Sequence, residues 1–175
     1  SNIFDHKRNV GMFVHKGMVP RVKKKVFRKT HEKLLWVEIT LNGKQKAFLA
    51  VAYSHPQSSK SSVRKMKDLD DHKRLLTVLE DNINTLEESG NFDYMIVADT
   101  NSHLRSMGNS KNDAFGKELS VFLRVNSLET LRSNNQNSTD WTFIGANGDS
   151  VVDFIIVPTA RKQNFKDFQV LRDHN

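Results

Sequence analysis

The chain of 175 residues has no cysteine, only three prolines and no long hydrophobic run. The absence of cysteine excludes disulfides, thiolate nucleophiles and cysteine-ligated zinc, and is consistent with a reducing compartment. A membrane-spanning helix requires roughly 20 apolar residues, and no run approaches that length. Residues 1–3 show no signal-peptide pattern. We therefore expect a soluble protein, of a length that suits one ordinary domain with its own core.

Positive charge predominates in the composition. The 27 Lys and Arg residues outnumber the 20 Asp and Glu residues and give a net charge of +7. The basic residues are densest in the first half, around 23–29 and 60–73. Such a field attracts a polyanion such as DNA or RNA. A solvated surface explains the charge equally well when the charge is considered alone.

The hydrophobic pattern predicts three strands in the first 53 residues. They are expected at residues 10–14, as a short buried strand, and at residues 34–40 and 47–53. The sequence Asn42-Gly43 between the last two strands favours a tight hairpin turn, because this pair tolerates positive φ.

Two amphipathic helices are expected in the middle of the chain. The first spans residues 70–88 after a polar linker at 57–62, and its apolar residues recur at helical spacing. The second begins near the cap Asn112-Asp113. Its inward residues are expected to be Phe115, Leu119, Phe122 and Leu123.

Three more strands complete the predicted fold. Residues 94–98 are apolar throughout, as expected for a strand that is covered on both faces. Residues 151–157 form a strand that Pro158 ends, and residues 168–171 form the last one. Strands with helices inserted between them predict a mixed α/β domain with sheets at its centre.

Polar residues follow the apolar strand 94–98 directly. Asp99 is held by rigid backbone there and stays open to a substrate, although a turn or cap role is common for Asp after a strand. Asn101 could donate its amide to a phosphoryl oxygen, and equally it could be ordinary turn chemistry.

A second group of polar residues lies near the C-terminus. Asp153 interrupts an apolar strand, so we expect a buried carboxylate that needs a partner, and His174 is the partner that we choose. Asp173 precedes His174 directly. Hard divalent ions need oxygen ligands, and phosphodiester cleavage needs an oriented water, so these groups together predict a metal-assisted phosphodiesterase.

These residues carry a family resemblance. The chain resembles the endonuclease/exonuclease/phosphatase superfamily, and within it most closely the apurinic-type endonuclease domains of non-LTR retrotransposons. The resemblance lies in segments that follow one another in the expected order: Gly11–Val14, Ala50–Pro56, Ile96–His103, Gly116–Leu119, Thr139–Phe143, Ser150–Val157 and Arg172–His174.

The resemblance implies a four-layered α/β sandwich, with two mixed sheets packed face to face and helices outside. It also implies a magnesium-dependent endonuclease that nicks DNA, with manganese as a possible replacement for magnesium. A reverse transcriptase domain in the same polyprotein and an intracellular, nuclear location are further implications. A phosphatase, a lipid phosphodiesterase of the same superfamily and a catalytically silent nucleic-acid-binding module stay open as alternatives.

Carried over by position, the resemblance assigns the site residues. Asp99 resembles the residue that orients or deprotonates the attacking water and also contacts the metal, and Asn101 its phosphate-binding neighbour. Asp153 resembles the partner of the catalytic His174, and Asp173 the metal-associated acid. Tyr53 resembles the active-site tyrosine, while an aromatic residue that closes a core strand is an equal interpretation. For His103 we expect a structural role in its loop.

The loop after Tyr53 should border the site, so His55, Lys60 and Arg64 are expected to contact the phosphate backbone of nucleic acid. The superfamily's principal metal-binding Glu should precede Gly11, where the chain has no match. We therefore expect residues 1–175 to be a single domain that is either part of a longer protein or a degenerate relative with an incomplete metal site.

Overall fold

A six-stranded mixed sheet forms the centre of the computed structural model, which describes residues 2–4, 10–41, 45–58, 61–90, 92–131, 141–145 and 148–165. The strand order is β3-β4-β5-β6-β10-β7, and only the central pair β5–β6 is parallel. The strands are β3 (Val22–Lys25), β4 (Leu34–Thr40), β5 (Lys46–Tyr53), β6 (Asp93–Asp99), β10 (Asp153–Pro158) and β7 (Leu128–Thr130). The predicted mixed α/β fold class is confirmed.

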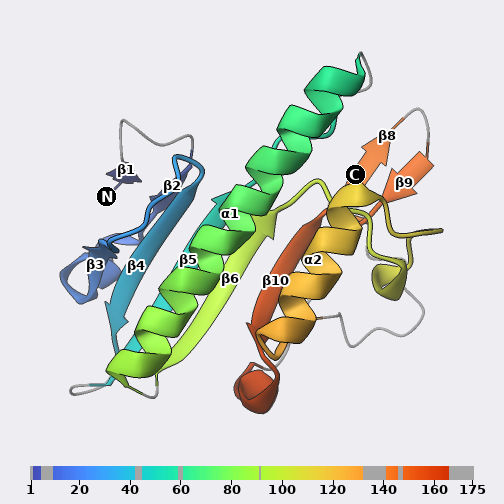
Figure 1. The fold of residues 1–175 in the computed structure, drawn as a ribbon. Helices are drawn as coiled ribbons and strands as arrows, with labels where there is room; N and C mark the ends of the chain where they lie inside the picture. Colours follow the sequence, from blue (N-terminus) through green and yellow to red (C-terminus); the bar gives the residue numbers. More distant parts are fainter. Residues whose placement is uncertain are drawn as a thin grey trace, which may run out of the picture.

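Two helices cover one face of this sheet (Figure 1). Helix α1 (Ser62–Ser89) connects β5 to β6, because parallel neighbours need a long crossover. Helix α2 (Ala114–Val125) packs beside it. Alternate residues of the strands point into the core beneath the helices. The fully buried side chains of this core include Leu34, Trp36, Leu75, Ile83, Leu86, Ile96, Leu119 and Ile156.

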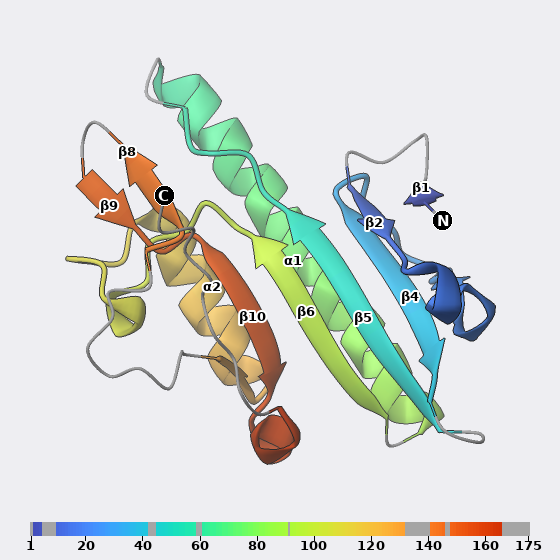
Figure 2. The same cartoon turned by 180° about the vertical axis from the view of Figure 1, so that it is seen from behind.

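Helix α1 is longer than its hydrophobic pattern predicts. It begins at Ser62 instead of residue 70, and the Ser61 side chain caps it by accepting a hydrogen bond from the Arg64 amide at 3.2 Å. The first turns expose Val63 and Met66, so they carry no apolar stripe that periodicity could detect. These turns extend past the end of β5 (Figures 1 and 2).

Helix α2 begins where the sequence predicts. The Asp113 side chain caps it by accepting a hydrogen bond from the Gly116 amide at 2.6 Å. Gly116 is also a point of close approach, because a Cβ atom at this position would lie 2.0 Å from the carbonyl oxygen of His103. The helix therefore packs directly against the loop that follows β6.

The other face of the sheet is only partly covered. Leu35 and Val37 of β4 are fully buried there, and the pair β1 (Asn2–Phe4) and β2 (Gly11–Phe13) lies on this side (Figure 2). Val97 of β6 is 38% exposed, so the prediction that residues 94–98 are covered on both faces is wrong for the described residues. The expected strand at residues 10–14 is present as β2, but Phe13 is exposed instead of buried.

The predicted hairpin between β4 and β5 is confirmed by their pairing, in which the Leu41 amide donates to the Gln45 carbonyl at 2.8 Å. Its turn residues 42–44 and the expected strand at 168–171 lie outside the described residues. Strand β10 begins at Asp153, two residues later than predicted, and Pro158 ends it. No described helix has the length and apolar character to cross a membrane.

A buried polar cluster joins α1 to the segment before β4. Asp71 of α1 accepts a hydrogen bond from the buried Lys33 ammonium and lies 3.3 Å from Nε2 of the buried His31. The Lys33 carbonyl accepts the Tyr53 amide at 3.0 Å. A buried ammonium needs such a partner, so the cluster fixes α1 against the end of β5.

Candidate active site

Three polar side chains from three neighbouring strands form a row at one end of the sheet. Tyr53 of β5 is the register partner of Asp99 of β6, and Asp99 is the register partner of Asp153 of β10. Register partners share a face, and this row lies on the face away from the helices, because the intervening Ala52, Ala98 and Phe154 enter the core. We call Tyr53, Asp99 and Asp153 the carboxylate row.

The environment of Asp99 favours its protonated form. Burial raises the pKa of the Asp99 carboxyl above its usual range, and the neighbouring Asp153 carboxylate raises it further. A hydrogen bond from the Asn101 amide acts in the opposite direction. A half-buried carboxylate beside a second carboxylate is a place where a positive charge is favourable.

Asn101 is fixed directly beside this carboxylate. Its backbone has φ of +48°, in the left-handed region that Asn tolerates better than most residues. Its Nδ2 donates to the Ser54 carbonyl at 2.8 Å and to Asp99 Oδ1 at 3.0 Å, and its backbone amide donates to the same oxygen at 3.2 Å. Both Nδ2 hydrogens are thereby engaged, so Oδ1 is the free end of the side chain among the described residues.

Asp153 differs from its prediction in one respect. Its side chain is exposed instead of buried, because β10 begins at this residue and the carboxylate lies at the end of the sheet. The hydroxyl of Thr142 fixes the backbone here, accepting hydrogen bonds from the amides of Val152 and Asp153 at 3.0 and 3.1 Å. The position of Asp153 in the row is therefore fixed through its backbone amide, which donates to the Thr142 hydroxyl.

Tyr53 contacts one of the residues predicted to bind nucleic acid. Its hydroxyl lies 3.3 Å from Nδ1 of His55, and the two rings meet edge to face with centroids 5.2 Å apart. Both side chains reach solvent at the end of β5. Arg64 lies in the exposed first turn of α1.

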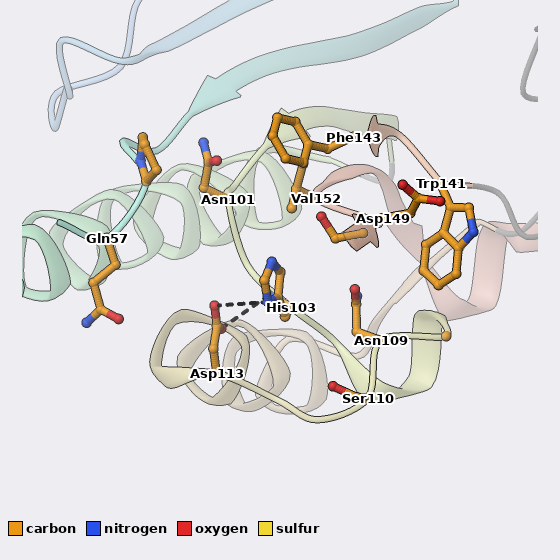
Figure 3. A pocket seen from close by; sticks show the side chains of 13 residues that line it. Gln57, Asn101, His103, Asn109, Ser110, Asp113, Trp141, Phe143, Asp149 and Val152 are labelled. Atoms are coloured by element: carbon orange, nitrogen blue, oxygen red, sulfur yellow. Dashed lines mark hydrogen bonds and ion pairs between the residues drawn. The ribbon is translucent and has the colours of Figure 1, made fainter. Parts of the chain in front are cut away.

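A cavity of about 760 Å³ adjoins the carboxylate row at Asn101 and Val152. Figure 3 shows His103 and Asp113 pointing toward one another on one side and Trp141 on the opposite side, and Nδ1 of His103 lies 3.8 Å from the Asp113 carboxylate. The antiparallel pair β8 (Phe143–Gly145) and β9 (Gly148–Ser150) borders the cavity. The residue that caps α2 therefore also lies beside the His103 side chain, and the structural role of His103 in its loop stays a prediction.

Three predicted site residues lie outside the described part of the chain: Lys60, Asp173 and His174. Their roles, and the pairing of His174 with Asp153, stay predictions. Within the described ranges there is no cluster of three or more His, Cys, Asp or Glu side chains that could hold a metal ion.

The sequence interpretation missed Ser54, His72 and Thr142 as contributors to the site. Ser54 and Thr142 stand inside segments that carry the resemblance, but their contacts depend on partners far away in the sequence. His72 is a polar residue on the buried face of α1, where it is fully buried beside Leu75 and Leu76. A buried His on an apolar helix face is the signal that could have identified it.

Two examples illustrate the solved structures that share this fold. The endonuclease domain of TRAS1, a telomere-specific non-LTR retrotransposon, matches at 17% identity with a TM-score of 0.54, over 87% of this chain and 61% of that one. A β-hairpin deletion mutant of Staphylococcus aureus beta toxin matches at 14% identity with a TM-score of 0.52, over 81% of this chain and 53% of that one. The chain therefore spans between half and two thirds of these proteins.

The fold and the motif order place the chain in the endonuclease/exonuclease/phosphatase class. More particularly, it belongs to the family described as endonuclease-reverse transcriptase, whose model matches residues 48–175. That range contains the whole carboxylate row. No curated protein matches the sequence.

Proposed function

We propose that this domain, residues 1–175, is a metal-dependent endonuclease that nicks DNA and acts in one polypeptide with a reverse transcriptase. The observation that carries the proposal is the carboxylate row, in which Asp99 is flanked by Tyr53 and Asp153 beside an open cavity. The family description and the TRAS1 neighbour support DNA as the substrate. Genomic DNA as the substrate would require a nuclear location.

Among the described residues, Asp99 fits one carboxylate ligand of a magnesium ion, with manganese as a substitute. Asp99 and Asp173 would hold the ion, which accepts one or two protein carboxylates and keeps several waters. The raised pKa of Asp99 beside a second carboxylate is the observation that favours a cation here. When bound, the ion would stabilise negative charge on the phosphoryl oxygens.

The side chains of the row have separate roles in the proposal. Asp99 accepts a proton from the attacking water or orients it, and Asn101 aligns Asp99 through two hydrogen bonds to Oδ1. Tyr53 presents its hydroxyl to the scissile phosphate from the neighbouring strand. Asp153 orients the imidazole of His174, which contacts the same phosphate.

Nucleic acid would approach along the loop and helix that leave β5. His55, Lys60 and Arg64 follow Tyr53 in sequence, and the exposed first turns of α1 add Lys65 and Lys67. Basic side chains there would neutralise backbone phosphates without reading bases. The first turns of α1 extend beyond the end of β5 that carries Tyr53 (Figure 1).

The test is magnesium-dependent nicking of supercoiled plasmid by the protein and by Asp99→Asn. The substitution removes the charge at the centre of the row, so we expect nicking to fall by at least about 100-fold. The matched control is Asp93→Asn at the opposite end of the same strand, where Asp93 pairs with Arg161 at 3.3 Å. Nicking by Asp99→Asn at the wild-type rate would contradict the proposal.

A catalytically silent nucleic-acid-binding module is the second candidate. The absence of a three-residue ligand cluster in the described ranges favours it. Calorimetric titration with manganese separates the two candidates. A stoichiometric site that Asp99→Asn removes supports the endonuclease, whereas DNA binding without such a site supports the silent module.

A further inference from the structure

Ser54 is a buried junction next to the carboxylate row. It follows Tyr53 directly and is 2% exposed. Its amide donates to the Asp99 carbonyl at 2.8 Å, and its carbonyl accepts Nδ2 of Asn101 at 2.8 Å. The backbone of this single residue therefore contacts both polar residues of the loop after β6.

The side chain of Ser54 has a different partner on the helix layer. Its hydroxyl lies 3.0 Å from Nδ1 of His72, which is fully buried in α1. The His72 ring stacks on Phe115 of α2 with centroids 4.3 Å apart and an interplanar angle of 9°. The imidazole of α1 therefore packs against α2 through Phe115 and contacts the Ser54 hydroxyl through Nδ1.

The resulting path runs from the helices to the row without a break. It begins at the stacked pair of His72 and Phe115, passes through the Ser54 hydroxyl and carbonyl to Asn101, and ends at Asp99 Oδ1. Asn101 has a positive φ, which costs free energy for a non-glycine residue and persists only where contacts hold it.

We propose that Ser54 and His72 are positioning residues that act through Asn101 on Asp99. The proposal rests on the proposed endonuclease function. The buried hydrogen bond between His72 and the Ser54 hydroxyl fixes where the Ser54 carbonyl lies. That carbonyl takes one Nδ2 hydrogen of Asn101, so the second hydrogen is directed at Asp99 and Oδ1 of Asn101 faces away from it.

A matched pair of substitutions isolates the hydrogen bond. His72→Phe keeps an aromatic ring to stack on Phe115 but has no nitrogen for Ser54, whereas His72→Asn retains a polar group near the place of Nδ1. Ser54→Ala removes the other partner. We expect His72→Phe and Ser54→Ala to lower kcat for nicking about tenfold with KM changed less than twofold, because a small misplacement of a reacting group slows chemistry. His72→Asn should recover most of that loss.

The double-substitution cycle with Asn101→Ala separates positioning from general stability. If Ser54 and His72 act through Asn101, adding either substitution to Asn101→Ala should lower kcat less than twofold further. A role confined to fold stability would give the same tenfold loss in both backgrounds. That additive result, or wild-type kcat in His72→Phe, would overturn the proposal.

A readout without catalysis keeps the proposal testable if the wild-type protein does not nick DNA. The Nδ2 hydrogens of Asn101 can be assigned in NMR spectra by their loss in Asn101→Ala. In His72→Phe and Ser54→Ala we expect them to exchange with solvent at least tenfold faster. The internal control is the buried Asn109, whose Nδ2 donates to the carbonyls of Leu104 and Val151 at 3.1 Å and should exchange at an unchanged rate. Unchanged exchange at Asn101 would overturn the proposal whether or not the protein nicks DNA.

Discussion

A neutral imidazole inside the core makes stability depend on pH. Burial lowers the pKa of His72 to about 4, whereas a histidine in the unfolded chain titrates near 6.5. Between these pH values the unfolded chain binds a proton that the folded protein does not bind, so acid favours unfolding. The contribution of His72 is complete above pH 6.5 and is lost as pH falls toward 4, by about 3 kcal/mol in total.

Urea denaturation of the wild type and of His72→Phe at pH 7 and pH 4 tests this prediction. All other titrating groups, including the buried His31, are common to both proteins and largely cancel in the difference between their free energies of unfolding. That difference should shift in favour of His72→Phe by about 3 kcal/mol at the lower pH. A difference that does not change with pH would show that His72 is not held neutral.

At the scale of residues, the sequence pattern was sufficient to locate Tyr53, Asp99 and Asn101 at or just beyond the ends of two apolar strands, and the structure has them there. Their catalytic roles stay predictions. The structure adds that Tyr53 and Asp99 are register partners. The sequence could not predict the contact between Ser54 and His72, because they lie 18 positions apart and approach only when α1 packs on the sheet. It also gave the wrong burial for Asp153, because strand pattern does not specify where a sheet ends.

At the scale of elements, Gly116 reverses the usual effect of alanine in a helix. Alanine normally stabilises a helix interior by about 1 kcal/mol relative to glycine. Here the added Cβ would lie 2.0 Å from the His103 carbonyl oxygen, which is backbone and cannot rotate away. We expect Gly116→Ala to destabilise the protein by about 2 kcal/mol, because α2 must shift away from the loop.

Thermal or urea unfolding measures this change, with Lys117→Ala as the control. Lys117 is exposed on the same turn of α2, so its substitution should alter the free energy of unfolding by less than about 0.5 kcal/mol. Greater stability of Gly116→Ala than of the wild type would mean that α2 can move from the loop without loss.

The two helices also show which signals in the sequence identify an element. Helix α2 was predictable because Asp113 caps it and its apolar face is buried. The start of α1 was not, because its first turns bury nothing and depend on helix propensity and the Ser61 cap. The short strands β7, β8 and β9 have three residues each, too few to show a pattern of alternation.

At the scale of the whole molecule, the net charge of +7 predicts strongly salt-dependent DNA binding. A surface that neutralises about three phosphates loses about 40-fold in affinity between 50 and 200 mM salt. Binding to one DNA duplex over this range measures the slope of log K against log salt. Arg64→Ala should reduce the slope by about 0.9. Arg161→Ala should leave it unchanged, because Arg161 pairs with Asp93 at the end of β6 far from Asp99. Affinity that does not change with salt would contradict a phosphate-binding surface.

The place of β10 in the sheet has a consequence for protein synthesis. Although β10 follows β7 in the chain, it lies between β6 and β7, and β7 pairs with β10 in the six-stranded sheet. A nascent chain that has emerged from the ribosome only as far as β7 can align Tyr53 with Asp99, but it still lacks Asp153. Translation must therefore proceed past Asp153 before the carboxylate row is complete, so the row forms late in the synthesis of residues 1–175.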